Sequence, residues 1–153
     1  SFTHISGGEN NNAYGYATVV LGGYDNRVFD DYNTILGGSV NRVFGADNTI
    51  VGGFENECEG EHNLIAGGES NYSSKGSKGV SIVGGTDNEA SGSFTHISGG
   101  ENNNAYGYAT VVLGGYDNRV FDDYNTILGG SVNRVFGADN TIVGGFENEC
   151  EGE

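Results

Sequence analysis

Residues 33–38 read Asn-Thr-Ile-Leu-Gly-Gly, and residues 48–53, fifteen places later, read Asn-Thr-Ile-Val-Gly-Gly. Gly-Gly pairs recur along the whole chain of 153 residues at this step of 15, with a single longer step of 17. The pairs begin at Gly7, Gly22, Gly37, Gly52, Gly67, Gly84, Gly99, Gly114, Gly129 and Gly144. Over a longer distance, residues 93–153 repeat residues 1–61 without a change, at an offset of 92. A fixed short period predicts a repeat protein whose units stack on their neighbours. We therefore expect one continuous solenoid over residues 1–153, with a module at 1–92 and a partial identical copy at 93–153.

Three places in each unit have a restricted choice of residue. If the first glycine of each pair is position 1, position 7 is small or β-branched and position 14 is always Val or Ile. Position 5 is Asn in every unit, and in the first module these residues are Asn11, Asn26, Asn41, Asn56, Asn71 and Asn88. We expect a ladder in which each Asn amide bonds the equivalent amides of the adjacent units. Asn selected only for turn geometry is the alternative, and both give the same fold.

The frequent glycines and the lack of a 3.6-residue apolar stripe exclude helices. Two short strands per unit fit the pattern, at positions 5–8 and 11–15, with glycine-permitted turns at positions 1–2 and 9. The constant step predicts that equivalent strands of successive units pair in parallel and in register. The predicted fold class is all-β: a parallel β-solenoid of stacked 15-residue coils, whose interior holds positions 7 and 14.

The one 17-residue unit contains a small polar insertion, Ser73-Ser74-Lys75-Gly76-Ser77-Lys78-Gly79. Because Ile82 resumes the position-14 column, we expect residues 74–79 to bulge outward without breaking the stack. Lys75 and Lys78 should then be exposed.

The second strand of each unit is apolar on both faces. Next to the inward position 14, position 15 carries Leu21, Leu36, Val51 and Val83, whereas position 6 of the other strand carries Arg27, Arg42, Glu57 and Glu89. A strand that is apolar on both sides needs cover on both sides, and the coil itself covers only one. We therefore expect Leu21, Leu36, Val51 and Val83 to form an interface with another chain.

The runs Asn33-Thr34-Ile35-Leu36-Gly37-Gly38 and Asn48-Thr49-Ile50-Val51-Gly52-Gly53, with Val43 and Gly45 or Cys58 and Gly60 in the half that follows, resemble the YadA-like head repeats of trimeric autotransporter adhesins. The resemblance covers essentially all ten units, although the commonest unit of that family has 14 residues and lacks the doubled glycine. It implies a left-handed parallel β-roll and a homotrimer around one axis. Similar Gly-Gly-x-x-Asn units occur in phage fibres and other bacterial surface proteins.

Charge and composition exclude several classes of function. The net charge of −15 opposes binding to nucleic acid and to anionic membranes. No apolar run is long enough to span a bilayer, so we expect no membrane insertion by this segment. No constellation of residues outside the repeat suggests catalysis, and we expect no enzyme and no cofactor.

The histidines and the acidic residues are the candidate metal ligands of this sequence. His4 and His96 share position 13, where the imidazoles of a trimer could surround an axial ion, and His62 lies elsewhere. Calcium could take carboxylates from Asp25, Asp30 and Asp31 or from Glu55, Glu57, Glu59 and Glu61. A solvated acidic face is the favoured interpretation, so we expect no metal site. Cys58 and Cys150 lie six coils apart, roughly 29 Å, which is too far for a disulfide.

Position 8 gives Tyr14, Phe29 and Phe44 in successive units, an aromatic stack that either packs or binds a ligand.

Taken together, the sequence favours a segment of an extracellular or cell-surface fibre that self-associates as a homotrimer or a higher filament. The alternative is an adhesin head that binds a receptor or matrix molecule.

Overall fold

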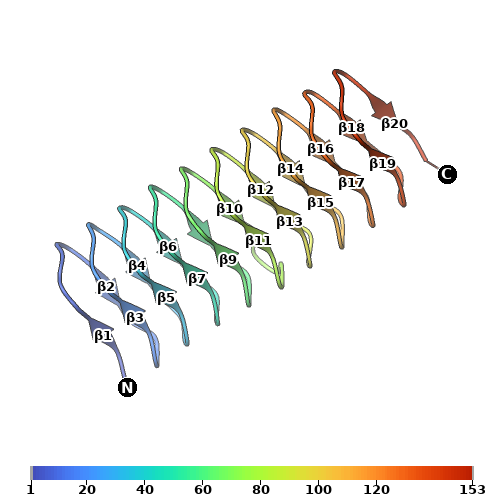
Figure 1. Cartoon of the computed structure of the whole chain (residues 1–153). Helices are drawn as coiled ribbons and strands as arrows, with labels where there is room; N and C mark the ends of the chain where they lie inside the picture. The colour runs from blue at the N-terminus through green and yellow to red at the C-terminus, as the bar shows by residue number, and fades with distance from the viewer. Residues whose placement is uncertain (1, 153) are drawn as a thin grey trace.

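The computed structural model describes residues 2–152, which form a straight rod of ten coils (Figure 1). Each coil contributes two strands of two residues, and residues 2–152 contain no helix. The odd-numbered strands are β1 (His4–Ile5), β3 (Val19–Val20), β5 (Thr34–Ile35), β7 (Thr49–Ile50), β9 (Leu64–Ile65), β11 (Ser81–Ile82), β13 (His96–Ile97), β15 (Val111–Val112), β17 (Thr126–Ile127) and β19 (Thr141–Ile142). The even-numbered strands are β2 (Asn12–Ala13), β4 (Arg27–Val28), β6 (Arg42–Val43), β8 (Glu57–Cys58), β10 (Tyr72–Ser73), β12 (Glu89–Ala90), β14 (Asn104–Ala105), β16 (Arg119–Val120), β18 (Arg134–Val135) and β20 (Glu149–Cys150).

The strands form two ten-stranded parallel sheets, one of the odd-numbered and one of the even-numbered strands. We call them the odd sheet and the even sheet. Each strand pairs with its equivalent one coil away, as His4 does with Val19 and Arg27 with Arg42. The pairing continues through the longer unit, where Leu64 pairs with Ser81. The expected parallel, in-register solenoid is therefore confirmed.

The core is a narrow apolar column between the two sheets. Ile35 and Ile50 of the odd sheet and Val28 and Val43 of the even sheet are fully buried. Cys58 and Ala90 replace the Val in later coils and are also fully buried. Every coil contributes only about two such side chains, so stability depends on stacking and not on any single coil.

The turns extend beyond the glycine-permitted turns expected at positions 1–2 and 9. Non-glycine residues occupy the left-handed backbone region at position 4, such as Asp25 at φ 49° and Val40 at φ 59°, and at position 11, such as Tyr32 at φ 57°. Position 11 therefore belongs to a turn. Both strands are shorter than expected, at positions 6–7 instead of 5–8 and at positions 13–14 instead of 11–15. At these residues the N–H points back along the rod, and the Tyr32 N–H donates to the Tyr16 carbonyl at 2.8 Å. This bond offsets part of the cost of a left-handed residue, about 1–2 kcal/mol.

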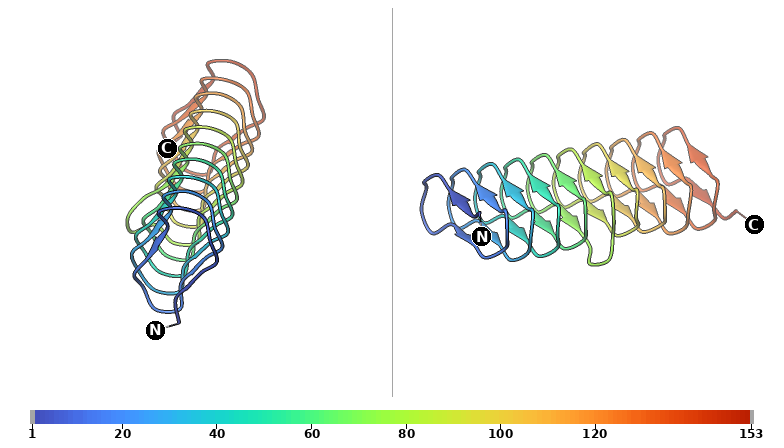
Figure 2. Two further views of the ribbon diagram at one scale, coloured as in Figure 1. Left: turned by 90° about the vertical axis from the view of Figure 1, so that its left-hand side faces the viewer. Right: turned by 90° about the horizontal axis from the view of Figure 1, so that it is seen from below.

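The insertion in the longer unit is smaller than expected. Only Lys75 and Gly76 leave the coil, in a turn closed by the Ser77 N–H donating to the Ser74 carbonyl at 3.1 Å. Gly76 has φ 87°, which suits the third residue of a type II turn. Ser77 is buried, contrary to the expectation that residues 74–79 all bulge outward, because it occupies the glycine column at position 9. Lys75 and Lys78 are exposed, as expected. The right-hand view of Figure 2 shows this turn projecting beyond its neighbours.

Candidate functional site

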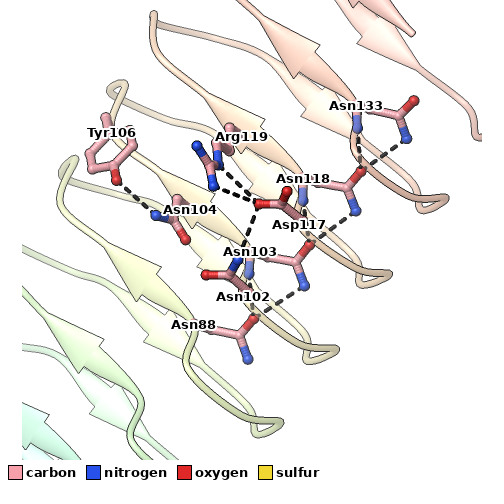
Figure 3. Close-up of polar contacts among 9 residues, drawn as sticks. All are labelled: Asn88, Asn102, Asn103, Asn104, Tyr106, Asp117, Asn118, Arg119 and Asn133. Atoms are coloured by element: carbon pink, nitrogen blue, oxygen red, sulfur yellow. Dashed lines mark hydrogen bonds and ion pairs between the residues drawn. The ribbon is translucent and has the colours of Figure 1, made fainter. Parts of the chain in front are cut away.

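The side chains of the position-5 asparagines form a hydrogen-bonded column inside the rod. The Asn41 backbone N–H and its Nδ2 both donate to Asn26 Oδ1 at 3.1 Å, and Asn41 Oδ1 accepts from Asn56 in the same way at 3.0 and 3.2 Å. The Asn41 Nδ2 also donates to the carbonyls of Gly37 and Gly53. The same amide therefore links coils and closes its own turn. Figure 3 shows the column through Asn88, Asn103, Asn118 and Asn133.

A second polar column at position 12 was not predicted. Asn33 Nδ2 donates to the Gly45 carbonyl at 2.7 Å, and Asn33 Oδ1 accepts the backbone N–H of Asn48 at 2.7 Å. The column consists of Asn and Thr with one Val, so strict identity did not reveal it. Its members are Thr3, Thr18, Asn33, Asn48, Asn63, Val80, Thr95, Thr110, Asn125 and Asn140. Across residues 2–152, no buried side-chain nitrogen or oxygen lacks a hydrogen-bond partner.

The outer face of the odd sheet carries no Asp, Glu, Lys or Arg at positions 13 and 15 of any coil. At position 15, Leu21, Leu36, Val51 and Val83 point away from their own core and are 46, 43, 41 and 48% exposed. The second copy repeats this arrangement, with Leu113 and Leu128 exposed to a similar degree. The sheet thus presents an uncharged face along the whole rod, which we call the uncharged face.

The outer face of the even sheet is charged and aromatic. Arg42 lies 3.8 Å from Glu57 of the next coil, and Arg27 lies 2.9 Å from Asp25 of its own coil. The equivalent Arg119–Asp117 pair is visible in Figure 3, where Asn102 also donates to Asp117. These contacts are half-exposed and contribute little stability each.

Exposed aromatic rings run along the rod in two columns. At position 8, Tyr14 stacks on Phe29 and Phe29 on Phe44, with ring centroids 5.7 and 4.7 Å apart and planes within 17° and 1°. The stack ends at Phe44, because Glu59 occupies the same position in the next coil. It resumes in the second copy as Tyr106, Phe121 and Phe136. A second column of rings in edge-to-face contact was not predicted, because its rings alternate between positions 10 and 11. Its members are Phe2, Tyr16 and Tyr32 in the first copy and Phe94, Tyr108 and Tyr124 in the second.

The candidate metal ligands meet in pairs at most, such as Glu57 with Glu59 and His62 with Asp47. His96 Nε2 lies 2.9 Å from Ser98 Oγ, and His62 Nδ1 lies 3.8 Å from Asp47 Oδ2, while His4 is exposed. Within the described part of the chain, no three His, Cys, Asp or Glu side chains are grouped to hold a metal ion. The Asp31 carboxylate instead accepts the backbone N–H of Tyr16.

Three neighbouring side chains, Glu57, Cys58 and Tyr72, have raised pKa values. Burial, a hydrogen bond with Glu59 and the Glu59 charge together raise the pKa of Glu57. Partial burial and the Glu59 carboxylate, which accepts the Tyr72 hydroxyl at 3.0 Å, raise the pKa of Tyr72 to about 12. Burial in the core raises the pKa of the Cys58 thiol to about 12, which keeps it protonated and unreactive near neutral pH. Both cysteines are free.

No protein-family model and no curated protein sequence matches the chain. The part of the chain that the structure describes contains no helix able to cross a membrane. What the fold establishes is a parallel β-solenoid of ten stacked coils, a geometry compatible with a β-roll.

Proposed function

We propose that this chain is a structural segment of an extracellular or cell-surface fibre, and that it self-associates through the uncharged face. The observation that supports this most is the absence of charge from that face over ten coils, in a chain of which 18% is charged. Burying the exposed part of each Leu or Val at position 15 would contribute roughly 1 kcal/mol, and seven of the ten coils carry one of these residues there. Depletion of charged residues is typical of the central part of protein interfaces.

A parallel homotrimer is the assembly we favour. In it three chains pack around a common axis, as the resemblance to the adhesin repeats implies, and the leucines of position 15 meet near that axis. The even sheet then faces solvent, where its charges keep neighbouring fibres apart. Hydrogen-bonded ladders along the axis give such a rod its mechanical continuity.

The test compares two substitutions of equal severity on opposite faces. Leu36→Asp together with Leu128→Asp should dissociate or unfold the assembly, because six carboxylates of a trimer would be buried near one axis. Arg42→Asp together with Arg134→Asp should leave the assembled mass unchanged, because these side chains are half-exposed on the other sheet. Light scattering of both double variants distinguishes the results. Equal masses for the two would contradict the proposal.

An adhesin head that binds a receptor or matrix molecule is the second candidate. It is favoured by the aromatic stack, since Tyr14, Phe29 and Phe44 remain 69, 42 and 41% exposed. Exposed stacked rings are common in surfaces that bind another molecule.

A further inference from the structure

The projecting turn and the end of the aromatic stack enclose a groove of about 430 Å³. Its floor is the coil corner around Gly45 and Gly60, and its wall is the turn at Lys75 and Gly76. A smaller hollow of about 230 Å³, lined by Phe44, Glu59 and Lys75, adjoins it. The volume lies within the range of about 300–1,000 Å³ typical of small-molecule sites.

The Phe44 ring lines this groove and is 41% exposed. One face of the ring is covered by Phe29, nearly parallel at 4.7 Å. The other face points along the rod toward the next coil, where Glu59 stands in the aromatic column and supplies no ring. The groove therefore lies beside the end of the stack, where a flat apolar surface can contact the Phe44 ring.

Polar groups of both signs surround the ring. The carboxylates of Asp30, Glu59 and Glu61 offer hydrogen-bond acceptors, and the ammonium groups of Lys75 and Lys78 offer donors. Three carboxylates disfavour an anion, and two ammonium groups disfavour a cation. A ligand with many hydroxyl groups, which donate and accept at once, satisfies this lining without a net charge.

The wall of the groove is held in place by several contacts. The Ser77 hydroxyl donates to the Ser74 carbonyl at 2.7 Å, and the Lys78 backbone N–H donates to Ser93 Oγ at 3.1 Å. Lys78 Nζ lies 3.6 Å from Glu61 Oε2, which joins the turn to the coil below. A groove whose walls are fixed in advance loses less entropy on binding.

We propose that this groove is a binding site for a neutral saccharide. A pyranose ring would stack its apolar face on Phe44, and its hydroxyls would bond Glu59, Glu61 and Lys75. None of the groove residues belongs to the uncharged face, so assembly through that face leaves the site open. The site needs the two extra residues of the longer unit, and it therefore occurs once per 92-residue module.

The experiment measures binding of the full chain to lactose, maltose and cellobiose by calorimetry, with a sialylated and a sulfated saccharide and an aromatic peptide as further probes. We expect binding to at least one neutral disaccharide. Phe44→Ala should weaken it about tenfold or more, since the stacking surface is lost. Removing Lys75 and Gly76, which restores the 15-residue step, should abolish it.

Phe136→Ala is the matched control. Phe136 stacks on Phe121 as Phe44 does on Phe29, at 4.9 Å and 3°, but no projecting turn follows it in residues 137–152. The control should bind as the unsubstituted chain does. Absence of binding at millimolar saccharide, preference for a charged saccharide or the peptide, or an equal loss in Phe136→Ala would overturn the proposal. Light scattering of the same variants reports assembly separately, so this failure is distinct from failure of the fibre proposal.

Discussion

Cys58 and Cys150 occupy the same position in identical stretches of sequence, yet Cys58 is fully buried and Cys150 is only half-buried. The difference arises because β10 pairs with β8 and covers Cys58, whereas β20 is the last strand of its sheet. Burial in this protein is thus a property of the neighbouring coil, and not of the local sequence.

Alkylation should report this difference. We expect iodoacetamide at neutral pH to modify Cys150 in the native protein and to leave Cys58 unmodified, because a buried thiol with a raised pKa supplies almost no thiolate. Peptide mass spectrometry distinguishes the two sites. Appending a second copy of residues 62–92 after Glu153 should protect Cys150 as well. Equal reaction rates at the two cysteines in the native chain would be inconsistent with coil-on-coil burial.

The two glycines of a pair should tolerate substitution differently. A Cβ on Gly38 would overlap the carbonyl oxygen of Gly53 in the next coil, and Gly38 has φ 86°, whereas a Cβ on Gly37 meets nothing within 4 Å. We expect Gly38→Ala to destabilise the protein by more than about 2 kcal/mol and Gly37→Ala by less than about 1 kcal/mol. Chemical denaturation of the two variants measures the difference. A reversed order would show that the turn geometry is wrong.

Loss of one ladder amide should be costly. Asn41→Ala removes the partners of buried groups on Gly37, Gly53 and Asn56, and the free energy of unfolding should fall by at least about 3 kcal/mol. Asn12→Ala is the control, since the Asn12 amide bonds only the nearby Asn10 carbonyl and should cost about 0.5 kcal/mol or less. Equal losses of unfolding free energy in the two variants would contradict a stabilising role of the asparagine column.

The Tyr72 hydroxyl should ionise only at a pH above that of an ordinary tyrosine. Since folding raises its pKa from 10.0 to about 12, the neutral hydroxyl stabilises the folded state below pH 10, and this contribution is lost as the pH rises through about 12. The difference in ultraviolet absorbance between the native chain and Tyr72→Phe should titrate near pH 12. Glu59→Gln should lower the midpoint, because it removes the carboxylate that accepts the hydroxyl. A midpoint at pH 10 in the native chain would contradict the observed contact.

The repeat predicted most of the fold because every unit places the same residue types at the same positions of the coil. The constant step predicted parallel pairing, and the Val or Ile at position 14 predicted the core. The left-handed backbone conformation at position 11 was not predicted, because aromatic residues such as Tyr32 and Phe94 rarely adopt a positive φ. The groove beside Phe44 was not predicted either, because Phe44 and the turn at residues 75–76 lie two coils apart in the sequence and are brought together only by the stacking of the coils.

The mass of the native assembly tests the central claim most directly. One chain has a mass of 16.0 kDa, and sedimentation equilibrium at neutral pH should give a multiple of it, three chain masses for the homotrimer that we favour. A dimer or a larger filament would keep the uncharged face as an interface and change only the number of chains. A stable monomer of 16.0 kDa, with Leu36 and Leu128 left in water, would contradict the account.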